Sequence, residues 1–303
     1  MTDPILDIRN LSVSFGRLRA LDDVSFMVAA GERLALIGHN GAGKSTLFKA
    51  VLGFLSPKAG AISVAGHIPG TDAARIAITY LPEVVAFPRS LSGREVLAYF
   101  SGLRNAPKAQ ISDLLDRVGL TEAADRAVGT YSKGMRQRLG LAQALIGAPR
   151  LLLLDEPTSG LDPVSRHDFY EVIAEAAARG AAVLLSSHGL EEIQSRTDRV
   201  AILSGGSLRA VGTMEDLARE AALPTTIRVT ALQGEADRLH SELGGRRLNG
   251  CRLEIDCTPE AKLALLARLG THRDVLQDID VAAPGLDDIY RHHSRRSDME
   301  ESE

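Results

Sequence analysis

One short segment constrains the fold of this chain more than any other, because it places glycines around a lysine and two hydroxyl side chains. It reads Gly38-His39-Asn40-Gly41-Ala42-Gly43-Lys44-Ser45-Thr46 and fits the pattern Gly-x-x-x-x-Gly-Lys-Ser/Thr. The apolar run Arg33–Ile37 before it is typical of a strand, and Leu47, Phe48, Val51 and Leu52 after it have helical spacing. A strand, a glycine loop and a helix N-terminus in this order predict an anion site.

Each residue type in this loop has a chemical reason to be there. The glycines allow a tight turn that points backbone N–H groups inward, and the helix dipole favours negative charge. We expect Lys44 to reach the β- and γ-phosphates of a nucleotide and Ser45 to offer its hydroxyl to Mg²⁺. The alternative is a structural turn that contains Gly-Lys-Ser by chance, but that does not explain the flanking strand and helix. We therefore predict that the chain binds a nucleoside triphosphate.

Composition sets broader limits. A chain of 303 residues suits one large domain and a smaller one, or two of middling size. Hydrophobic residues make up 45% and charged residues 24%, as in a globular protein with a core. The net charge of −4 and the pI of about 6.1 argue against a nucleic-acid partner. No apolar run approaches transmembrane length, the N-terminus lacks the features of a signal peptide, and two cysteines make no disulfide framework. We expect a cytoplasmic protein that reaches a membrane only through a partner.

A second chemical feature follows the apolar run Leu151–Leu154, which is typical of a strand buried on both faces of a parallel sheet. Asp155 and Glu156 come directly after it, at the end where ligands bind in such sheets. Asp155 can hold Mg²⁺ directly or through water, and Glu156 can polarise a water aimed at the γ-phosphate. Alone, an Asp-Glu pair is a common strand exit, but together with the glycine loop it predicts a hydrolytic site.

The remaining pattern up to about residue 221 predicts strands around a helical insertion. Between Ser92 and Gly147 the pattern is helical, and Asp162-Pro163 looks like the start of a helix that Gly180 ends. His188 follows a buried strand at the same sheet edge as the acidic pair, so we favour a γ-phosphate contact over a purely structural role. Leu21-Asp22-Asp23 is expected to be a turn. The expected strands are Ile5–Phe15, Val24–Val28, Ala61–Val64, Ile76–Leu81 and Ala181–Ser186, with a closing hairpin of Val200–Ser204 and Leu208–Val211.

With these motifs in place, residues 5–220 resemble the nucleotide-binding domain of ABC transporters. Tyr131–Arg138 looks like the signature sequence of the family, with Ser132-Lys133-Gly134-Met135 where the commonest form has Ser-Gly-Gly-Gln. That variant is typical of the ABC-2 subgroup. Ser159–Asp162 matches the D-loop of the family, His188 its switch histidine, and Phe15 the aromatic residue that stacks on adenine.

The resemblance implies the fold and the partners. The fold class is α/β, a P-loop NTPase domain of the ABC type with a mixed sheet core, an antiparallel β subdomain and a helical subdomain at about 90–148. ATP and Mg²⁺ are the implied cofactors, and two copies are expected to dimerise head to tail. The loop around Lys44 of one copy would then meet Ser132–Met135 of the other. Hydrolysis would be coupled to a separate membrane permease.

One position departs from the family pattern, because Glu83 stands where glutamine is usual at the end of the strand that includes Leu81. Either side chain offers an oxygen to Mg²⁺, so the exchange is tolerable. The alternative interpretation is that Glu83 marks a subgroup, because the surrounding residues closely resemble the NosF ATPases, which serve copper-site maturation of nitrous oxide reductase. The similar segments are Gly38–Gly41, Leu81–Glu83, Phe87-Pro88, Leu91–Glu95, Thr130–Leu145 and Gly285–Arg291.

That closer resemblance implies a NosY-like permease and a periplasmic NosD-like protein as partners, with the ATPase at the inner face of the membrane. An ABC-2 export ATPase for a drug, lipid or polysaccharide is the alternative. A non-transport ATPase acting on DNA or ribosomes would require features that this chain lacks, such as a basic face. We expect the membrane contact near Glu83–Phe100.

The last part of the chain, residues 222–293, reads as a small α+β domain. Its order, βαββαβ with an added C-terminal helix, suggests a ferredoxin-like unit. Cys251 and Cys257 suggest copper binding at first sight, but with Leu253 and Ile255 they fall on one face of a strand, which favours a core role. We expect residues 294–303 to be a disordered charged tail.

Overall fold

The computed structural model describes residues 3–187 and 189–300. It divides into two compact units, Met1–Thr213 and Met214–Glu303. The boundary lies a few residues before the position expected at 221, because helix α8 (Met214–Glu220) packs against helix α11 (Leu286–Glu300) of the second unit.

A six-stranded sheet forms the centre of the first unit, in the order β5-β6-β7-β3-β8-β9. Its strands are parallel except β9, which returns antiparallel to β8 in the expected hairpin. Leu151–Leu154 are fully buried, as expected for a strand covered on both faces. The six strands are β3 (Arg33–Ile37), β5 (Ile78–Leu81), β6 (Leu151–Asp155), β7 (Ala182–Ser186), β8 (Arg199–Ser204) and β9 (Ser207–Gly212).

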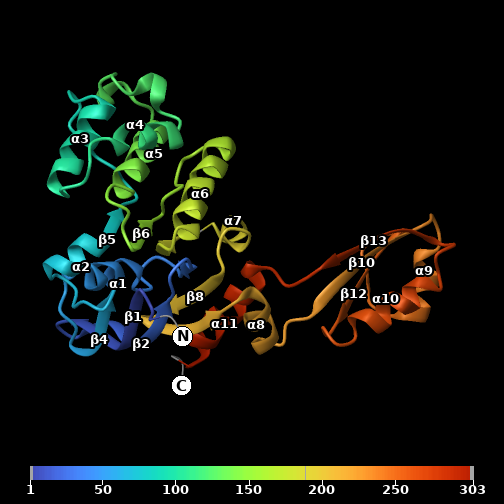
Figure 1. Ribbon diagram of the computed structural model, residues 1–303. Coiled ribbons are helices and arrows are strands. Elements are labelled where there is room, and N and C mark those ends of the chain that lie inside the picture. The colour runs from blue at the N-terminus through green and yellow to red at the C-terminus, as the bar shows by residue number, and fades with distance from the viewer. Residues whose placement is uncertain (1–2, 188, 301–303) are drawn as a thin grey trace. The chain divides into compact units, whose positions relative to one another are not determined.

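A three-stranded antiparallel sheet, in the order β2-β1-β4, lies beside this core (Figure 1). It consists of β1 (Leu6–Phe15), β2 (Leu18–Val28) and β4 (Ala59–Val64). The expectation of a turn at Leu21-Asp22-Asp23 is wrong, because these residues lie inside β2. The pairing of β1 and β2 shifts register there, and Asn10 and Asp23 adopt left-handed φ values of 47° and 53°. Asn10 Nδ2 donates to Asp23 Oδ1 at 2.8 Å, so irregular pairing accommodates polar residues that resemble turn material in the sequence.

The helices of the first unit include the predicted helical insertion, and α3, α4 and α5 lie together in Figure 1. Asp162 caps α6 as expected, because its Oδ1 accepts from the N–H of Ser165 at 3.0 Å and Pro163 is the first helical residue. The helices are α1 (Lys44–Val51), α2 (Asp72–Ala77), α3 (Gly93–Leu103), α4 (Gln110–Arg117), α5 (Lys133–Ala144), α6 (Pro163–Ala178) and α7 (Leu190–Gln194), with 3₁₀ turns at Thr121–Ala123 and Val128–Thr130.

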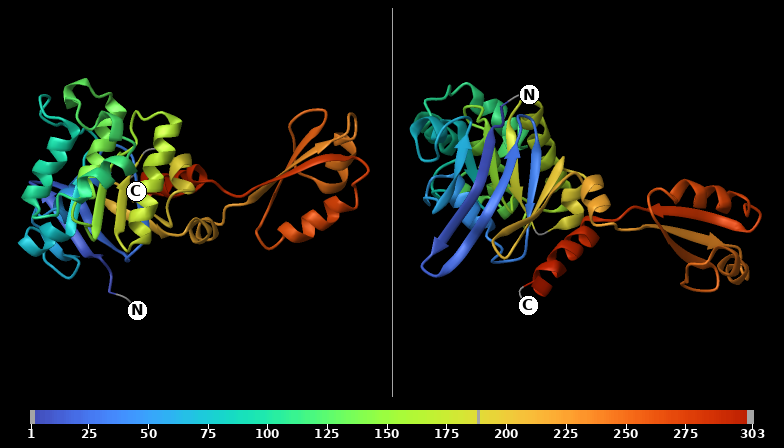
Figure 2. Two further views of the ribbon diagram at one scale, coloured as in Figure 1. Left: turned by 45° about the horizontal axis from the view of Figure 1, so that its top comes forward. Right: turned by 90° about the horizontal axis from the view of Figure 1, so that it is seen from below.

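The second unit contains a four-stranded antiparallel sheet in the order β11-β12-β10-β13. Leu239 of α9 and Leu265 and Leu269 of α10 pack in one core with buried residues of this sheet. Two further views of the sheet and its helices are given in Figure 2. Helix α11 continues to Glu300, whereas the sequence predicts a disordered tail from residue 294. The elements are β10 (Thr225–Ala231), α9 (Ala236–Leu243), β11 (Arg246–Arg247), β12 (Arg252–Cys257), α10 (Lys262–Gly270) and β13 (Leu276–Ala282).

The two cysteines of the second unit are free thiols and partly buried. Leu253 and Ile255 between them are buried, and Cys257 packs against the same core. Within the described ranges, no group of three or more histidine, cysteine, aspartate or glutamate residues is arranged to hold a metal ion. The packing of Cys257 agrees with the core interpretation of this strand.

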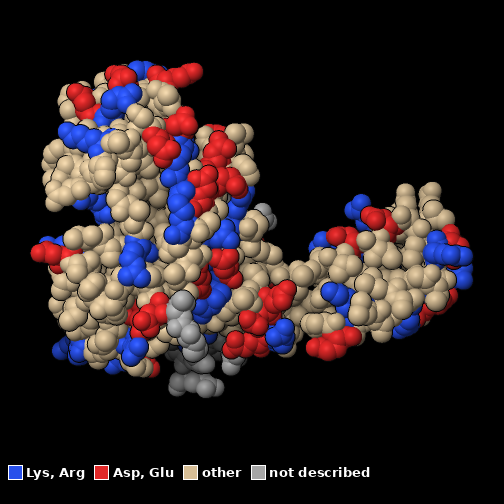
Figure 3. All heavy atoms as spheres, viewed as in Figure 1, with Lys and Arg blue, Asp and Glu red and all other residues tan. Residues whose placement is uncertain are grey.

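The surface charge and the character of the helices both bear on the choice of partners. On the face shown in Figure 3, basic and acidic side chains are interspersed, and neither sign forms a continuous field. Among residues 3–187 and 189–300, no helix has the length and apolar character needed to span a membrane.

Candidate nucleotide-binding site

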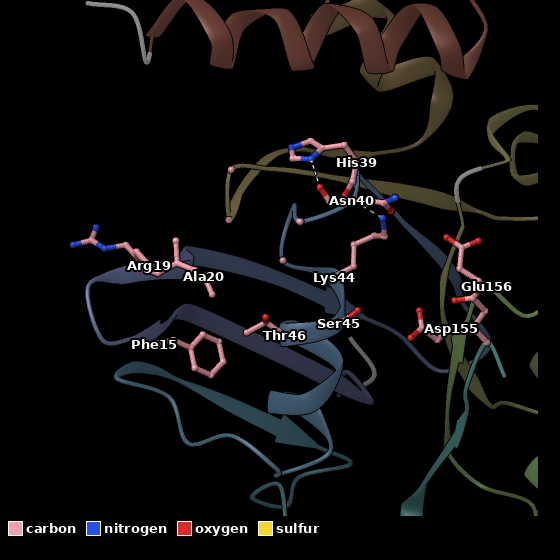
Figure 4. Close-up of a pocket in the computed structure, with 16 residues that line it drawn as sticks. Phe15, Arg19, Ala20, His39, Asn40, Lys44, Ser45, Thr46, Asp155 and Glu156 are labelled. Carbon is pink, nitrogen blue, oxygen red and sulfur yellow. Dashed lines mark hydrogen bonds between the residues drawn. The ribbon is translucent and has the colours of Figure 1, made fainter. Parts of the chain in front are cut away.

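A cavity of about 470 Å³ lies where β3 and β6 end, beside the N-terminus of α1 (Figure 4). Most of the predicted ligand residues of a single chain line it, and they come from separate parts of the first unit. The predicted residues among its lining are Phe15, His39, Asn40, Gly41, Gly43, Lys44, Ser45, Thr46, Glu83, Asp155 and Glu156.

The backbone of the glycine loop has the conformation that its composition predicts. Gly41 and Gly43 have φ values of 88° and 111°, in the left-handed region that favours glycine. A Cβ at Gly43 would lie 2.8 Å from the carbonyl oxygen of Ala20, so close approach also requires glycine there. Gly43 is the N-cap of α1 and supplies no side-chain cap, which leaves the first-turn N–H groups for an anion.

Gly38 and Ala42 belong to the same loop but support it instead of lining the cavity. A Cβ at Gly38 would lie 2.9 Å from the Cβ of Ala42, so the loop can close only with glycine at this position. The carbonyl of Ala42 accepts from the N–H of Gly206 at 3.1 Å. This bond fixes the loop to the turn between β8 and β9.

Lys44 folds back over its own loop. Its Nζ donates to the carbonyl of Gly38 and, at 3.4 Å, to the carbonyl of His39. Burial lowers the pKa of Lys44 below its usual value of 10.5, and the nearby carboxylates of Glu156 and Asp155 oppose that shift. The ammonium is thus a partly desolvated cation, which attracts phosphate oxygens more strongly than an exposed lysine would.

The two acidic residues are positioned independently, although they are adjacent in sequence. Asp155 Oδ1 accepts from Ser186 Oγ at 2.6 Å, and its Oδ2 accepts from Tyr80 Oη at 3.1 Å. Glu156 adopts a left-handed φ of 47°, and its N–H donates to Ser186 Oγ at 3.1 Å. This backbone conformation ends the strand and turns the Glu156 side chain away from the direction of Asp155 (Figure 4). One carboxylate can therefore serve a metal ion while the other serves a water.

Tyr80 is a neutral donor to Asp155. Burial, and secondarily the charge of Asp155, raises the pKa of the Tyr80 phenol well above its ordinary value of 10.0. The hydroxyl therefore keeps its proton at physiological pH.

Oxygen donors that suit Mg²⁺ line the same cavity, namely Ser45, Asp155 and Glu83. Magnesium is usually held by one or two carboxylates together with substrate phosphates and waters, so a cluster of three acidic side chains is not required. These residues fit a magnesium ion that is bound with a nucleotide.

The far end of the cavity contains the predicted Phe15 and residues that sequence reasoning missed. Phe15 is 49% exposed at the end of β1, so its ring is accessible for stacking. Arg19 lines the cavity beside it and pairs with Asp22 at 2.7 Å. The residues added by the structure are Leu18, Arg19, Ala20, Gly205 and Gly206. The sequence signal for Gly205-Gly206 was its hairpin turn, but only the strand order shows that this turn reaches the glycine loop.

Four predicted ligand residues, Ser132–Met135, are not among those that line this cavity. Ser132 caps α5, and its Oγ accepts from the N–H of Met135 at 3.1 Å. Lys133 lies against Gly160, and Gly134 faces Leu161, where an added Cβ would lie 3.3 Å from Leu161 Cδ2. These residues therefore pack beside Ser159–Asp162 of their own chain. The predicted catalytic residue His188 lies outside the described residues.

Comparisons with known proteins agree with this geometry. The family model "ABC transporter" matches residues 21–159. The chain is 30% identical over 301 residues to the linearmycin resistance ATP-binding protein LnrL of Bacillus subtilis, covering 94% of this chain and 97% of that protein. It is 32% identical over 308 residues to the daunorubicin resistance ATP-binding protein DrrA3 of Streptomyces coeruleorubidus, covering 96% of both chains. A solved structure described as the ATP-binding subunit of an ABC transporter matches with a TM-score of 0.67 and 34% identity, over 71% of this chain and 92% of that one.

Proposed function

The chain belongs to the ATP-binding proteins of ABC transporters, and from that premise we propose that two copies close head to tail on ATP and drive a separate membrane permease. ATP hydrolysis is the activity of this family, and the cavity contains the groups that it requires. The dimer, the permease and the cargo are the parts that we propose.

The observation that supports the proposal is that the predicted ligand residues fall into two separate groups within one chain. The Lys44 loop and Asp155-Glu156 share one cavity, whereas Ser132–Met135, at the N-terminus of α5, lie outside it. A helix N-terminus with a serine hydroxyl offers N–H and O–H donors to an anion. A second copy can supply these donors to the γ-phosphate, and ATP then stabilises the closed dimer.

The chain's own residues have defined tasks in this scheme. Lys44 and the loop N–H groups bind the phosphates, and Phe15 stacks on the base. Glu156 orients the attacking water and accepts its proton, while His188 contacts the γ-phosphate. Mg²⁺, held by Ser45, Asp155 and Glu83, would neutralise charge on the β- and γ-phosphate oxygens. Release of the cleaved phosphate removes the anion between the copies and lets the dimer open.

Complementation between two inactive variants tests the shared site. Lys44→Ala removes the cation from one half of the site, and Ser132→Arg blocks the other half. Each variant alone should lack ATPase activity, whereas their mixture forms heterodimers with one intact site and should regain part of it. The control is the double variant Lys44→Ala/Ser132→Arg mixed with Lys44→Ala, which contains no intact site. If the first mixture stays as inactive as this control, the shared site is wrong.

The transport setting rests on two kinds of resemblance. The segments around Glu83 and Gly285–Arg291 resemble the NosF ATPases, so we propose a NosF-like role in copper-site assembly of nitrous oxide reductase, with NosY-like and NosD-like partners. The names of the similar resistance proteins support the second candidate, an ABC-2 type ATPase for export of a small molecule. Either role places the chain at the inner face of the membrane through its permease. Identification of the membrane protein that co-purifies with the tagged chain decides between the two.

We also propose that the second unit is a ferredoxin-like domain. Its chain order and the sheet order β11-β12-β10-β13 support this class.

A further inference from the structure

We propose that Tyr80 is a positioning residue for the magnesium carboxylate Asp155, and that it links this carboxylate to the strand that leads into Glu83. The inference deepens the proposed function and rests on it. No motif in the sequence marks Tyr80, which reads simply as a strand residue.

The strand register explains why the two side chains meet. Strands β5 and β6 run parallel, with Tyr80 paired to Leu153. Side chains two residues apart along a strand lie on the same face, so Asp155 follows Leu153 on the face that Tyr80 occupies. One such step is about 6.6 Å, a length that a tyrosine spans and a serine or threonine does not. The Tyr80 hydroxyl accordingly reaches Asp155 Oδ2 at 3.1 Å.

Asp155 is held from both sides by uncharged donors. Ser186, paired directly with Asp155 in β7, donates to Oδ1 at 2.6 Å, and Tyr80 donates to Oδ2. A neutral hydroxyl fixes the orientation of a carboxylate and leaves its negative charge in place. An arginine or lysine partner would instead offset that charge. Each oxygen keeps a lone pair, so the carboxylate can still bind Mg²⁺ or a water of its shell.

The ring of Tyr80 is itself held in place. It packs edge-on against Phe48 of α1, with ring centroids 6.3 Å apart and an interplanar angle of 88°. Helix α1 begins at Lys44, and β5 ends at Leu81, two residues before Glu83. Tyr80 therefore contacts the helix after the phosphate loop while it orients the metal carboxylate.

Tyr80→Phe isolates the hydrogen bond, because the ring and its contact with Phe48 are retained. Partners that orient a metal ligand typically contribute about 10-fold or more to metal affinity. We expect the variant to bind Mn²⁺ about 10-fold more weakly in the presence of a non-hydrolysable ATP analogue. Electron paramagnetic resonance of free Mn²⁺ measures this affinity, and calorimetry with the analogue in EDTA measures nucleotide binding without metal. The metal-free affinity should be unchanged.

Three outcomes are informative. Weaker Mn²⁺ binding with unchanged metal-free nucleotide binding supports the role. Unchanged Mn²⁺ binding in a variant whose thermal unfolding matches wild type overturns it, as does an equal loss of nucleotide affinity with and without metal. Tyr99→Phe is the matched control, since Tyr99 is 61% exposed on α3 and should change neither quantity. If wild-type protein fails to bind the ATP analogue in EDTA, the proposed function itself fails, and not only this inference.

Discussion

The side chain of Lys133 lies over Gly160 within the same chain, so that a methyl group at Gly160 would come 2.7 Å from Lys133 Nζ and 3.2 Å from its Cε. Gly160 has a left-handed φ of 77°. The contact joins the start of α5 to the loop before α6. Both segments belong to the surface that the proposed dimer uses, so this contact keeps them next to each other on that surface.

Gly160→Ala should disturb that surface in two ways. Alanine in the left-handed region costs about 1 kcal/mol, and its methyl group also displaces Lys133. We expect ATP-dependent dimerisation to weaken, as measured by light scattering, while nucleotide binding to the monomer is retained. Gly66→Ala is the matched control, because Gly66 has a φ of 86° with no atom within 4 Å of the added methyl group. If Gly160→Ala dimerises as tightly as Gly66→Ala, the contact with Lys133 is irrelevant to the dimer surface.

The lowered pKa of Lys44 predicts how ATP affinity depends on pH. Since burial lowers this pKa in the folded protein, Lys44 loses its charge at a lower pH than an exposed lysine, whose pKa is 10.5. Below the lowered pKa the buried charge costs stability in full, and this cost disappears as pH rises from that pKa to 10.5. ATP affinity should follow the opposite course, falling as pH rises toward 10.5 because the neutral amine no longer attracts phosphate.

Calorimetric titration of ATP in EDTA across alkaline pH measures this fall. Lys44→Arg is the control, because a guanidinium keeps its charge throughout that range. The arginine variant should bind more weakly but with a flat profile. Equal pH dependence in both proteins would assign the fall to another group.

The parts of the site that the sequence predicts are those whose signals are local. The phosphate loop lies between its own strand and helix, and Leu151–Glu156 shows both burial and charge within one segment. Residues that reach the site only through the order of the strands in the sheet have no such local signal and were not predicted. Tyr80 meets Asp155 only because β5 pairs with β6, and Gly206 meets Ala42 only because β8 lies beside β3.

The errors in the fold also have physical causes. Asp22 and Asp23 look like a turn, but the bulge that Asn10 and Asp23 stabilise keeps them inside β2. Helix α2 is too short for apolar periodicity to reveal it; its visible signal was the N-cap Thr71, whose Oγ1 accepts from the N–H of Ala74 at 3.3 Å. Helix α11 continues through residues that composition alone assigns to a tail.

Glu156→Gln should separate ATP binding from hydrolysis. The amide keeps the size of the side chain but cannot accept a proton from the attacking water, so turnover should fall by a factor of about 100 or more. ATP binding and ATP-dependent dimerisation should persist, because Lys44 and the loop N–H groups are untouched. Size-exclusion chromatography with ATP should show a lasting dimer. Near wild-type ATPase activity would remove Glu156 from its assigned role.

Glu83→Gln should behave differently, although the chemical change is the same. Glu83 lines the cavity, and its expected contribution is one oxygen to Mg²⁺. A carboxamide oxygen can replace a carboxylate oxygen as a magnesium ligand, although with less charge, so we expect ATPase activity within about threefold of wild type and a modestly higher Mg²⁺ requirement. Glu83→Ala removes the oxygen altogether and should raise the Mg²⁺ requirement further. Magnesium titrations of ATPase activity for both variants test this order. A loss in Glu83→Gln as large as that in Glu156→Gln would mean that the charge of Glu83 takes part in the reaction, and that glutamate at this position is more than a replacement for the usual glutamine.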